Sequence, residues 1–172
     1  MNKKVLAIPI VLMTVAMLVV PVMAQPTEEL KVPASLIAGP QAGGAPPEKQ
    51  WTTNGGIWQA RSQQVDYSPI GLTIGSDSYT DGYSRNFVNS VLNLKTKILN
   101  TRGLAVWTFK DIDGKDIGGF EGNLEMKLSV IDGYYSVHGV LFGFGNFEGQ
   151  TLMLSYEGPP AGAVWTGYCL KA

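Results

Sequence analysis

From Trp51 to the C-terminus, apolar and polar side chains alternate with a period of two residues. The clearest stretch is 123–130, where Leu124, Met126 and Leu128 are separated by polar residues. Because successive side chains of a strand point to opposite faces, this pattern predicts strands with one face on a core and the other in solvent. Burial on one face only is typical of antiparallel sheets.

Turn residues divide this region into short strands. Asp113-Gly114 and Asp132-Gly133 each lie between strand-like runs, and Asp-Gly favours a tight hairpin turn with positive φ. Residues 100–103 predict a longer hairpin loop, and residues 158–162 separate the last two strands. No amphipathic helix is predicted. The expected strands lie near 57–65, 69–75, 87–98, 103–111, 117–130, 134–145, 147–156 and 163–170.

This series of hairpins predicts an all-β fold, a single antiparallel β-barrel of about eight strands over residues 51–172. A sandwich is the alternative, but an up-and-down barrel is favoured because closure removes the exposed sheet edges.

One six-residue pattern occurs twice, at 118–123 and at 145–150, with Phe120 and Phe147 in equivalent positions. Each copy opens a predicted strand directly after a turn. Glycines at such points allow the chain to bend or bulge, and the phenylalanine is expected to fill the core. The pattern also pairs Glu121 with Glu148, but we expect glutamates at strand starts to be solvated rather than catalytic.

The second copy extends a run, 137–150, that resembles a recurring corner of the allene oxide cyclase and dirigent β-barrels. Gly143, Gly145, Phe147 and Gly149 carry the likeness. The resemblance implies a barrel of eight antiparallel strands whose lumen accepts a small apolar molecule. It transfers no catalytic residue to this sequence, since none can be matched to a position here.

Residues 1–24 have the three parts of a secretory signal peptide: Lys3 and Lys4, an uncharged apolar run, and the small residue Ala24. The run is near the lower length limit for a spanning helix, so an uncleaved signal-anchor is the alternative. The predicted protein is therefore either secreted or anchored to the outer face of the cytoplasmic membrane through residues 5–23. Residues 25–50 are rich in Pro, Ala and Gly, which predicts a disordered linker.

Charge and cysteine content exclude several classes of function. The net charge is −1 and no basic stripe exists to neutralise phosphates, so nucleic acid is not an expected partner. Cys169 is the only cysteine, so it forms no internal disulfide; we expect a half-buried side chain, with pairing between chains in a homo-oligomer as the alternative. The acidic turn at 111–116 resembles part of a calcium loop, but Gly114 comes too early, so no metal or other cofactor is predicted.

The expected function is non-enzymatic binding of a small apolar ligand in the lumen, by an exported or cell-surface protein. The residues predicted to contact the ligand are aromatic, together with the only histidine: Trp107, Phe109, His138 and Tyr156. No catalytic residue is predicted. A cyclase or isomerase in the same barrel, or a structural envelope or adhesion protein, are the alternatives.

Overall fold

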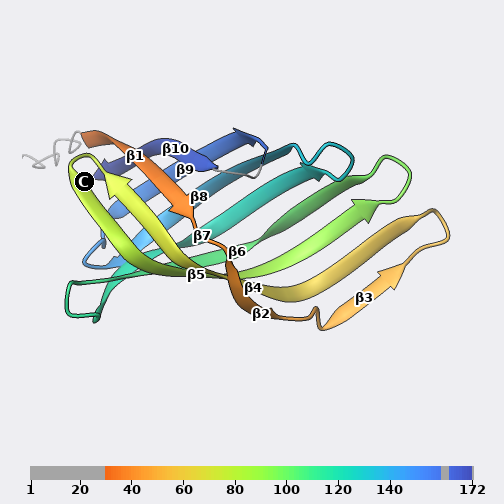
Figure 1. The fold of residues 1–172 in the computed structure, drawn as a ribbon, viewed down its shortest axis with the longest axis horizontal. Coiled ribbons are helices and arrows are strands. Elements are labelled where there is room, and N and C mark those ends of the chain that lie inside the picture. The colour runs from red at the N-terminus through yellow and green to blue at the C-terminus, as the bar shows by residue number, and fades with distance from the viewer. Residues whose placement is uncertain (1–29, 160–162, 172) are drawn as a thin grey trace, which may run out of the picture.

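The computed structural model describes residues 30–159 and 163–171. These residues form strands only (Figure 1), and no helix among them is long and apolar enough to cross a membrane. The ten strands are β1 (Leu30–Ala38), β2 (Gln41–Ala45), β3 (Lys49–Thr52), β4 (Ile57–Ile74), β5 (Asp77–Asn93), β6 (Ile98–Lys110), β7 (Asp116–Ser129), β8 (Tyr135–Gly145), β9 (Gln150–Gly158) and β10 (Val164–Lys171).

Eight of these strands form a closed antiparallel barrel. Strands β4 to β10 follow one another around the wall as consecutive neighbours, and β1 pairs with both β10 and β4 to close the ring. The predicted all-β barrel of about eight strands is confirmed, and the sandwich alternative is wrong. Closure by β1 leaves β2 and β3 as two additional short strands, each paired with β4.

Closure is confined to one end of the long strand β4. Residues 34–38 of β1 pair with residues 70–74 of β4, whereas on that side residues 58–61 of β4 pair with β3 and residues 64–67 with β2. Figure 1 shows the result: β1 closes the barrel at one end, while the long strands continue beyond it as a curved sheet edged by β3. The wall is therefore complete at one end and open at the other.

The prediction of a disordered linker over residues 25–50 is wrong for residues 30–50, and the barrel begins at Leu30 rather than at Trp51. The Pro, Ala and Gly content concealed an alternation in which Ala34 and Leu36 face the core, at 6% and 1% exposure. Pro33 has no N–H to donate to the sheet, but its carbonyl accepts a hydrogen bond from the Gly75 amide, at 2.8 Å. The predicted signal segment 1–24 lies outside the described residues.

Two predicted boundaries between strands are also wrong. The expected strand 87–98 is interrupted by a turn at 94–97, where the Asn93 side-chain oxygen accepts hydrogen bonds from the amides of Lys95 and Thr96. The turn contains no Gly or Pro that would have predicted it from the sequence. It forms without them because an Asn side chain can itself hydrogen-bond to the backbone of a turn. The expected loop at 100–103 is part of β6. Gly103 is there because a Cβ would lie 2.0 Å from the Phe87 carbonyl oxygen, a close approach between strands.

The two Asp-Gly turns agree with the sequence. Gly114 and Gly133 adopt φ values of 78° and 72° in hairpin turns, as their Asp-Gly pairs predicted. The expected break between the strands 57–65 and 69–75 is wrong, because both belong to the single strand β4, which shifts register between Tyr67 and Ile70. The expected start of the next strand at 87 is wrong too, since β5 begins at Asp77.

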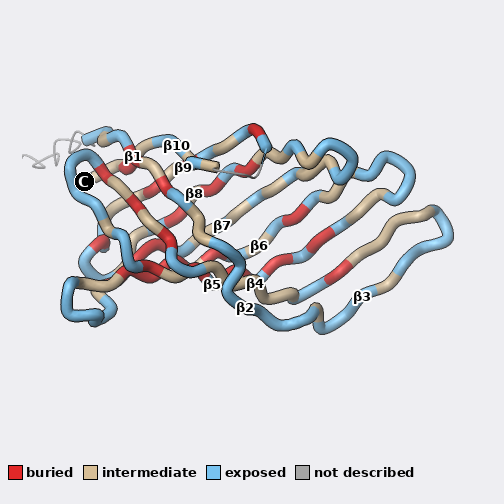
Figure 2. The backbone as a smooth tube through the Cα atoms, viewed as in Figure 1, coloured by how far each residue is buried: buried red, intermediate tan, exposed pale blue. Residues whose placement is uncertain are grey.

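The core fills the closed end of the barrel. Figure 2 shows buried positions alternating with exposed ones along the strands, as the period of two predicted. The largest fully buried side chains come from all the barrel strands except β5: Leu36, Ile70, Leu72, Trp107, Phe109, Phe120, Leu141, Leu152, Leu154 and Cys169 with Phe147 from the turn after β8. Dense aromatic packing at this end leaves the unfilled interior space toward the open end.

Candidate ligand-binding cavity

A cavity of about 750 Å³ lies inside the barrel. This volume falls within the range of about 300–1,000 Å³ that is usual for small-molecule sites. Its walls come from β1, β2, β4, β5, β6, β7, β8 and β10, with Gly39 after β1 and Ala163 before β10. The lining residues are Leu36, Ile37, Ala38, Gly39, Gln41, Gln63, Val65, Tyr67, Ile70, Ser84, Asn86, Val88, Ser90, Leu99, Thr101, Trp107, Leu124, Met126, Leu128, Tyr135, Val137, Ala163, Val164 and Trp165.

The walls are mainly apolar because the inward-facing positions of most strands are apolar. Leu124, Met126 and Leu128 of β7 face the cavity, in the alternation that the sequence shows most clearly. Val88 of β5 and Val137 of β8 continue this wall. An apolar molecule that entered the cavity would remove this surface from water, which is the main driving force for such binding.

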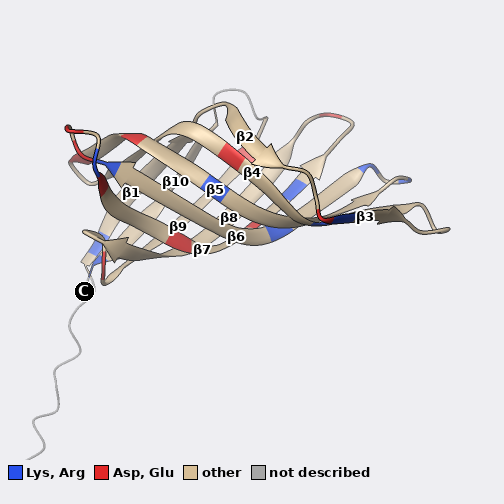
Figure 3. Ribbon diagram, turned by 90° about the horizontal axis from the view of Figure 1, so that it is seen from below, with Lys and Arg blue, Asp and Glu red and all other residues tan. Residues whose placement is uncertain are grey.

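None of the lining residues is Asp, Glu, Lys, Arg or His. Charged residues occupy other positions of the strands and loops, and Figure 3 shows both signs intermixed along the ribbon. This follows from strand alternation, because the charged positions of β5, β6 and β7 fall between the inward-facing ones: Arg85, Arg102 and Glu125, for example, are exposed. The interior is thus electrically neutral among the described residues.

A strip of uncharged polar side chains runs along β5 inside the cavity. The Asn86 amide nitrogen donates to the Val65 carbonyl at 3.1 Å and to the Ser84 hydroxyl at 2.7 Å. Further along, the Ser90 and Thr101 hydroxyls hydrogen-bond to each other at 3.0 Å. The Asn86 side-chain oxygen is buried and has no partner within the described structure.

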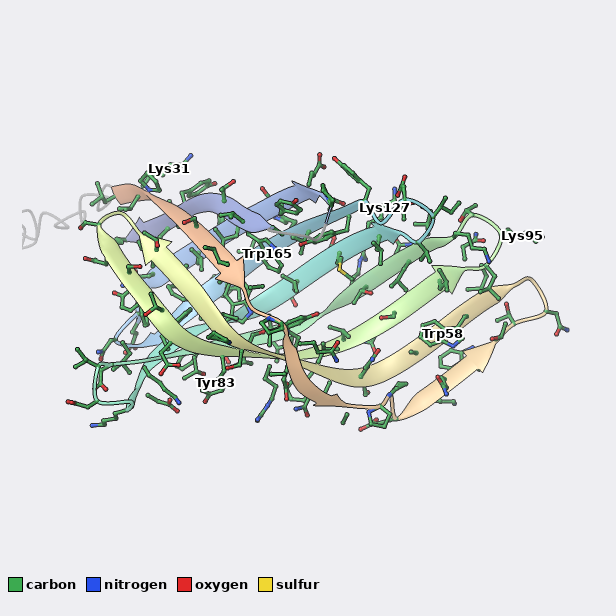
Figure 4. All side chains as sticks on the ribbon, in the orientation of Figure 1. Lys31, Trp58, Tyr83, Lys95, Lys127 and Trp165 are labelled. Atoms are coloured by element: carbon green, nitrogen blue, oxygen red, sulfur yellow. The ribbon has the colours of Figure 1, made fainter. Side chains whose placement is uncertain are left out.

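Aromatic side chains also form part of the lining. Trp165 on β10 lies with its ring centroid 5.8 Å from that of Trp107 on β6. Figure 4 shows Trp165 within the outline of the barrel, whereas Lys31, Lys95 and Lys127 lie at its periphery. The Trp165 indole nitrogen is buried and makes no hydrogen bond to a described residue.

The two tyrosines of the lining stay protonated at neutral pH. Burial raises the pKa of Tyr67, and repulsion from Tyr135 raises it further. Burial also raises the pKa of Tyr135, although the nearby Trp165 indole opposes this in part. The Trp165 N–H lies near the Tyr135 hydroxyl, so it favours the ionised form of Tyr135 and lowers its pKa. The two groups nevertheless do not have the geometry of a hydrogen bond. Both hydroxyls therefore remain neutral donors in a neutral cavity.

The four predicted ligand contacts occupy different environments. Trp107 lines the cavity and is 2% exposed. Phe109 does not line it, because it is fully buried in the core, 6.0 Å from Phe147 between ring centroids. Tyr156 lies beside the cavity; its ring is 5.1 Å from the lining residue Tyr135, and its hydroxyl donates to the Pro159 carbonyl at 2.7 Å.

The prediction that His138 contacts a lumen ligand is wrong. Val137 points inward and is buried, so His138, the next residue of β8, points outward and is exposed. It lies in a concavity of about 800 Å³ on the outer face of the barrel, together with an exposed Arg102–Glu125 ion pair of 3.3 Å. The polar and charged lining of this outer concavity is that of a solvated surface.

The sequence did not reveal the polar strip or Trp165 as parts of a site. The inward-facing residues Ser84, Asn86 and Ser90 of β5 are polar. This strand therefore lacks the alternation of apolar and polar residues that distinguishes the inner from the outer face of the other strands. A signal was nevertheless present, since small uncharged side chains alternate there with larger ones such as Arg85 and Phe87.

The acidic residues considered from the sequence do not gather into a site. The Asp111 carboxylate accepts hydrogen bonds from the amides of Asp113 and Lys115, as in an ordinary Asx turn. Glu121 and Glu148 are both exposed. Within residues 30–159 and 163–171, no group of three or more His, Cys, Asp or Glu residues is placed to hold a metal ion.

The described cavity can bind an uncharged apolar molecule and offer it a few hydrogen bonds. Its lining contains no group that ionises near neutral pH and could transfer a proton there. Comparison of the chain with family models, with curated proteins and with solved structures found no match.

Proposed function

We propose that this protein is a non-enzymatic binding protein that holds a small apolar molecule inside its barrel. The observation that carries this proposal is the cavity of about 750 Å³ with mainly apolar walls and no charged side chain in its described lining. The core at the closed end blocks passage through the barrel, so the ligand enters and leaves at the open end.

The pKa values of the titratable residues in the described lining favour ligand binding over cyclase or isomerase chemistry. A general acid or base works best with a pKa near the operating pH. Tyr67 and Tyr135 are the titratable residues of the described lining, and burial moves the pKa of each further above neutrality. His138, the only histidine of the chain, lies on the outer face.

The proposal places the protein outside the cytoplasm, either secreted or anchored to the outer face of the cytoplasmic membrane. The signal-like segment 1–24 supports export, and its apolar part, 5–23, supports anchoring if it is retained. The glycine corners that resemble those of allene oxide cyclase and dirigent barrels support a ligand in the lumen. The two corners meet in the barrel, where Gly118 pairs with Gly145.

Native mass spectrometry of protein purified without detergent, from cells that express the full chain, tests this proposal. We expect a non-covalent adduct that is lost on denaturation and can be extracted and identified. The denatured mass also shows whether the chain has been cleaved after Ala24. A protein that carries no adduct and binds none of a panel of apolar probes would contradict the proposal.

A matched pair of variants on β5 locates the ligand. Val88→Trp places a large ring in the cavity, whereas Val91→Trp makes the same change on the outward face of the same strand. We expect Val88→Trp to abolish retention of the adduct and Val91→Trp to preserve it. Thermal unfolding of both variants separates occlusion from loss of the fold, and retention by folded Val88→Trp would place the ligand elsewhere.

Self-association is a second candidate, favoured by apolar side chains on the outer face. Phe87 and Leu104 are directly opposite each other on β5 and β6, and they are 43% and 44% exposed. Sedimentation velocity of the wild type and of Phe87→Ser measures it: we expect a dimer or larger species that the substitution dissociates. A wild type that stays monomeric at all concentrations removes this candidate.

A further inference from the structure

We infer that the ligand is an uncharged amphiphile whose single polar group both donates and accepts a hydrogen bond, as the hydroxyl of a lipid-like alcohol does. This inference rests on the proposed function and adds to it the chemical class of the ligand. Three features of the cavity carry it: its neutral lining, the free acceptor of Asn86 and the free donor of Trp165.

The neutral lining disfavours charged ligands. An ion that leaves water for an apolar cavity loses its hydration, and only an opposite charge or several strong hydrogen bonds can offset that loss. The described lining offers no Lys, Arg or His to a carboxylate and no Asp or Glu to an ammonium group. The protonated Tyr67 and Tyr135 do not supply such a charge.

Asn86 requires a donor from the ligand. The residue is 4% exposed, and its two protein hydrogen bonds determine the orientation of the amide. The Val65 carbonyl can only accept, so the nitrogen of Asn86 must face it and the oxygen must face away. Asn86 is a lining residue of the cavity, and its side-chain oxygen is buried without a partner in the described structure. An unsatisfied buried acceptor is unfavourable.

Trp165 requires an acceptor from the ligand. An indole N–H can only donate, and this one is buried without a partner in the described structure. Its ring packs on Trp107, and Trp107 lies directly opposite Ser84, which is hydrogen-bonded to Asn86. Trp165, Trp107, Ser84 and Asn86 are thus successive neighbours in the lining of one cavity.

A hydroxyl group meets both requirements, whereas related groups meet one or neither. An ether or a carboxylate accepts but does not donate, and an alkane does neither. The apolar walls formed by Leu124, Met126 and Val88 then enclose the hydrocarbon part of the ligand.

A series of probes with one common chain tests the inference: dodecanol, its methyl ether, dodecanoate, dodecylammonium and dodecane. Calorimetric titration into the purified protein, freed of any retained ligand, gives each Kd. We expect dodecanol to bind most tightly and the ether about fivefold to tenfold more weakly, the usual effect of one hydrogen bond. The two ions should bind more weakly still.

Two variants assign the hydrogen bonds. Asn86→Val should remove the preference for dodecanol over its ether, while Asn89→Val, on the exposed face of the same strand, should leave it unchanged. Dodecanol should also shift the indole proton resonance of Trp165 downfield, and Trp165→Phe identifies that resonance by its loss. Circular dichroism confirms that each variant folds.

The outcomes separate the two proposals. If no probe binds, the proposed function fails and this inference fails with it. If the probes bind without distinction, or if an ion binds most tightly, ligand binding stands and the neutral-alcohol class is overturned. A preference for dodecanol that survives in folded Asn86→Val also overturns the assignment of the ligand's donor to Asn86.

Discussion

Phe120 and Phe147, the equivalent residues of the repeated sequence pattern, pack against each other with ring centroids 5.0 Å apart. The glycines that open the two copies, Gly118 and Gly145, are also paired directly across β7 and β8. The repeat therefore forms one structural unit at the closed end of the barrel. Its glycines let the backbones approach, and its phenylalanines occupy the space between the walls.

Replacement of either ring by alanine should destabilise the barrel strongly. Phe120 and Phe147 are 0% and 2% exposed, and loss of a buried phenylalanine ring costs about 3–5 kcal/mol. The double variant should cost less than the sum of the two, because both substitutions open one shared cavity. Urea unfolding gives the free energies. Phe142→Ala, at an exposed position of β8, should change stability by no more than about 0.5 kcal/mol.

Gly143→Ala should also destabilise the corner, for a different reason. A Cβ at this position would lie 1.8 Å from the Phe147 carbonyl oxygen, so the backbone of the corner would have to move. At Gly43 on β2 the nearest atom would be 3.8 Å away, so Gly43→Ala is the matched control. Thermal unfolding should show a lower Tm for Gly143→Ala only. Equal Tm values for the two variants would contradict the close approach.

Strand β1 can be tested by two adjacent residues. Leu36 is 1% exposed, and Ile37 beside it is 58% exposed. Leu36→Ala should cost about 2–5 kcal/mol of stability, whereas Ile37→Ala should cost much less. The free energy of unfolding in urea measures both losses. If residues 30–38 were a disordered linker instead of a barrel strand, both substitutions would have the same small effect.

Stability should fall in alkaline solution as buried tyrosines ionise. The pKa values of Tyr67 and Tyr135 are raised above the 10.0 expected in the unfolded chain, so above that pH the folded protein retains protons that the unfolded chain loses. Their contribution is fully present below pH 10.0 and is lost as the pH rises toward their folded pKa values. The Tyr67→Phe, Tyr135→Phe double variant should lose less stability between about pH 8 and about pH 11, measured by urea unfolding. An identical loss in both proteins would contradict this assignment.

Cys169 should react with thiol reagents only when the barrel opens. The residue is 0% exposed, burial raises the pKa of its thiol, and Sγ donates to the Gln150 side-chain oxygen at 3.3 Å. Spectrophotometric labelling should be slow in buffer and fast in denaturant. A Thr166→Cys, Cys169→Ser variant, with the thiol on the exposed face of β10, should react rapidly without denaturant. Rapid labelling of the wild type would show that β10 detaches readily.

The inner and outer faces of several strands could be predicted from local pattern. Leu124 and Met126 face the interior as expected, and Leu152 and Leu154 lie in the core. The turn at 94–97 could not be predicted in the same way, because apolar alternation continues through it and an Asn side chain replaces the usual glycine. Gly103 suggested a turn, but it allows two strands to approach closely.

The candidate site was predictable only in part. Trp107 was expected at the cavity and lines it, but an aromatic residue alone does not show whether it borders space or core, as Phe109 demonstrates. Whether His138 faces the interior depends on which alternate residues of β8 point inward. Val137 beside it is buried, so Val137 points inward and His138 points outward. The free oxygen of Asn86 follows from its contacts with other residues, which the sequence does not contain.

The sequence by itself determined that this chain forms antiparallel strands, because the period of two and the Asp-Gly turns are local properties of the backbone. Tertiary structure decided which segment closes the barrel and where space remains. The short pairing between β1 and residues 70–74 of β4 closes one end only. The repeated pattern shows the same division: the sequence identified two equivalent phenylalanines, and long-range strand pairing placed Phe120 and Phe147 in contact.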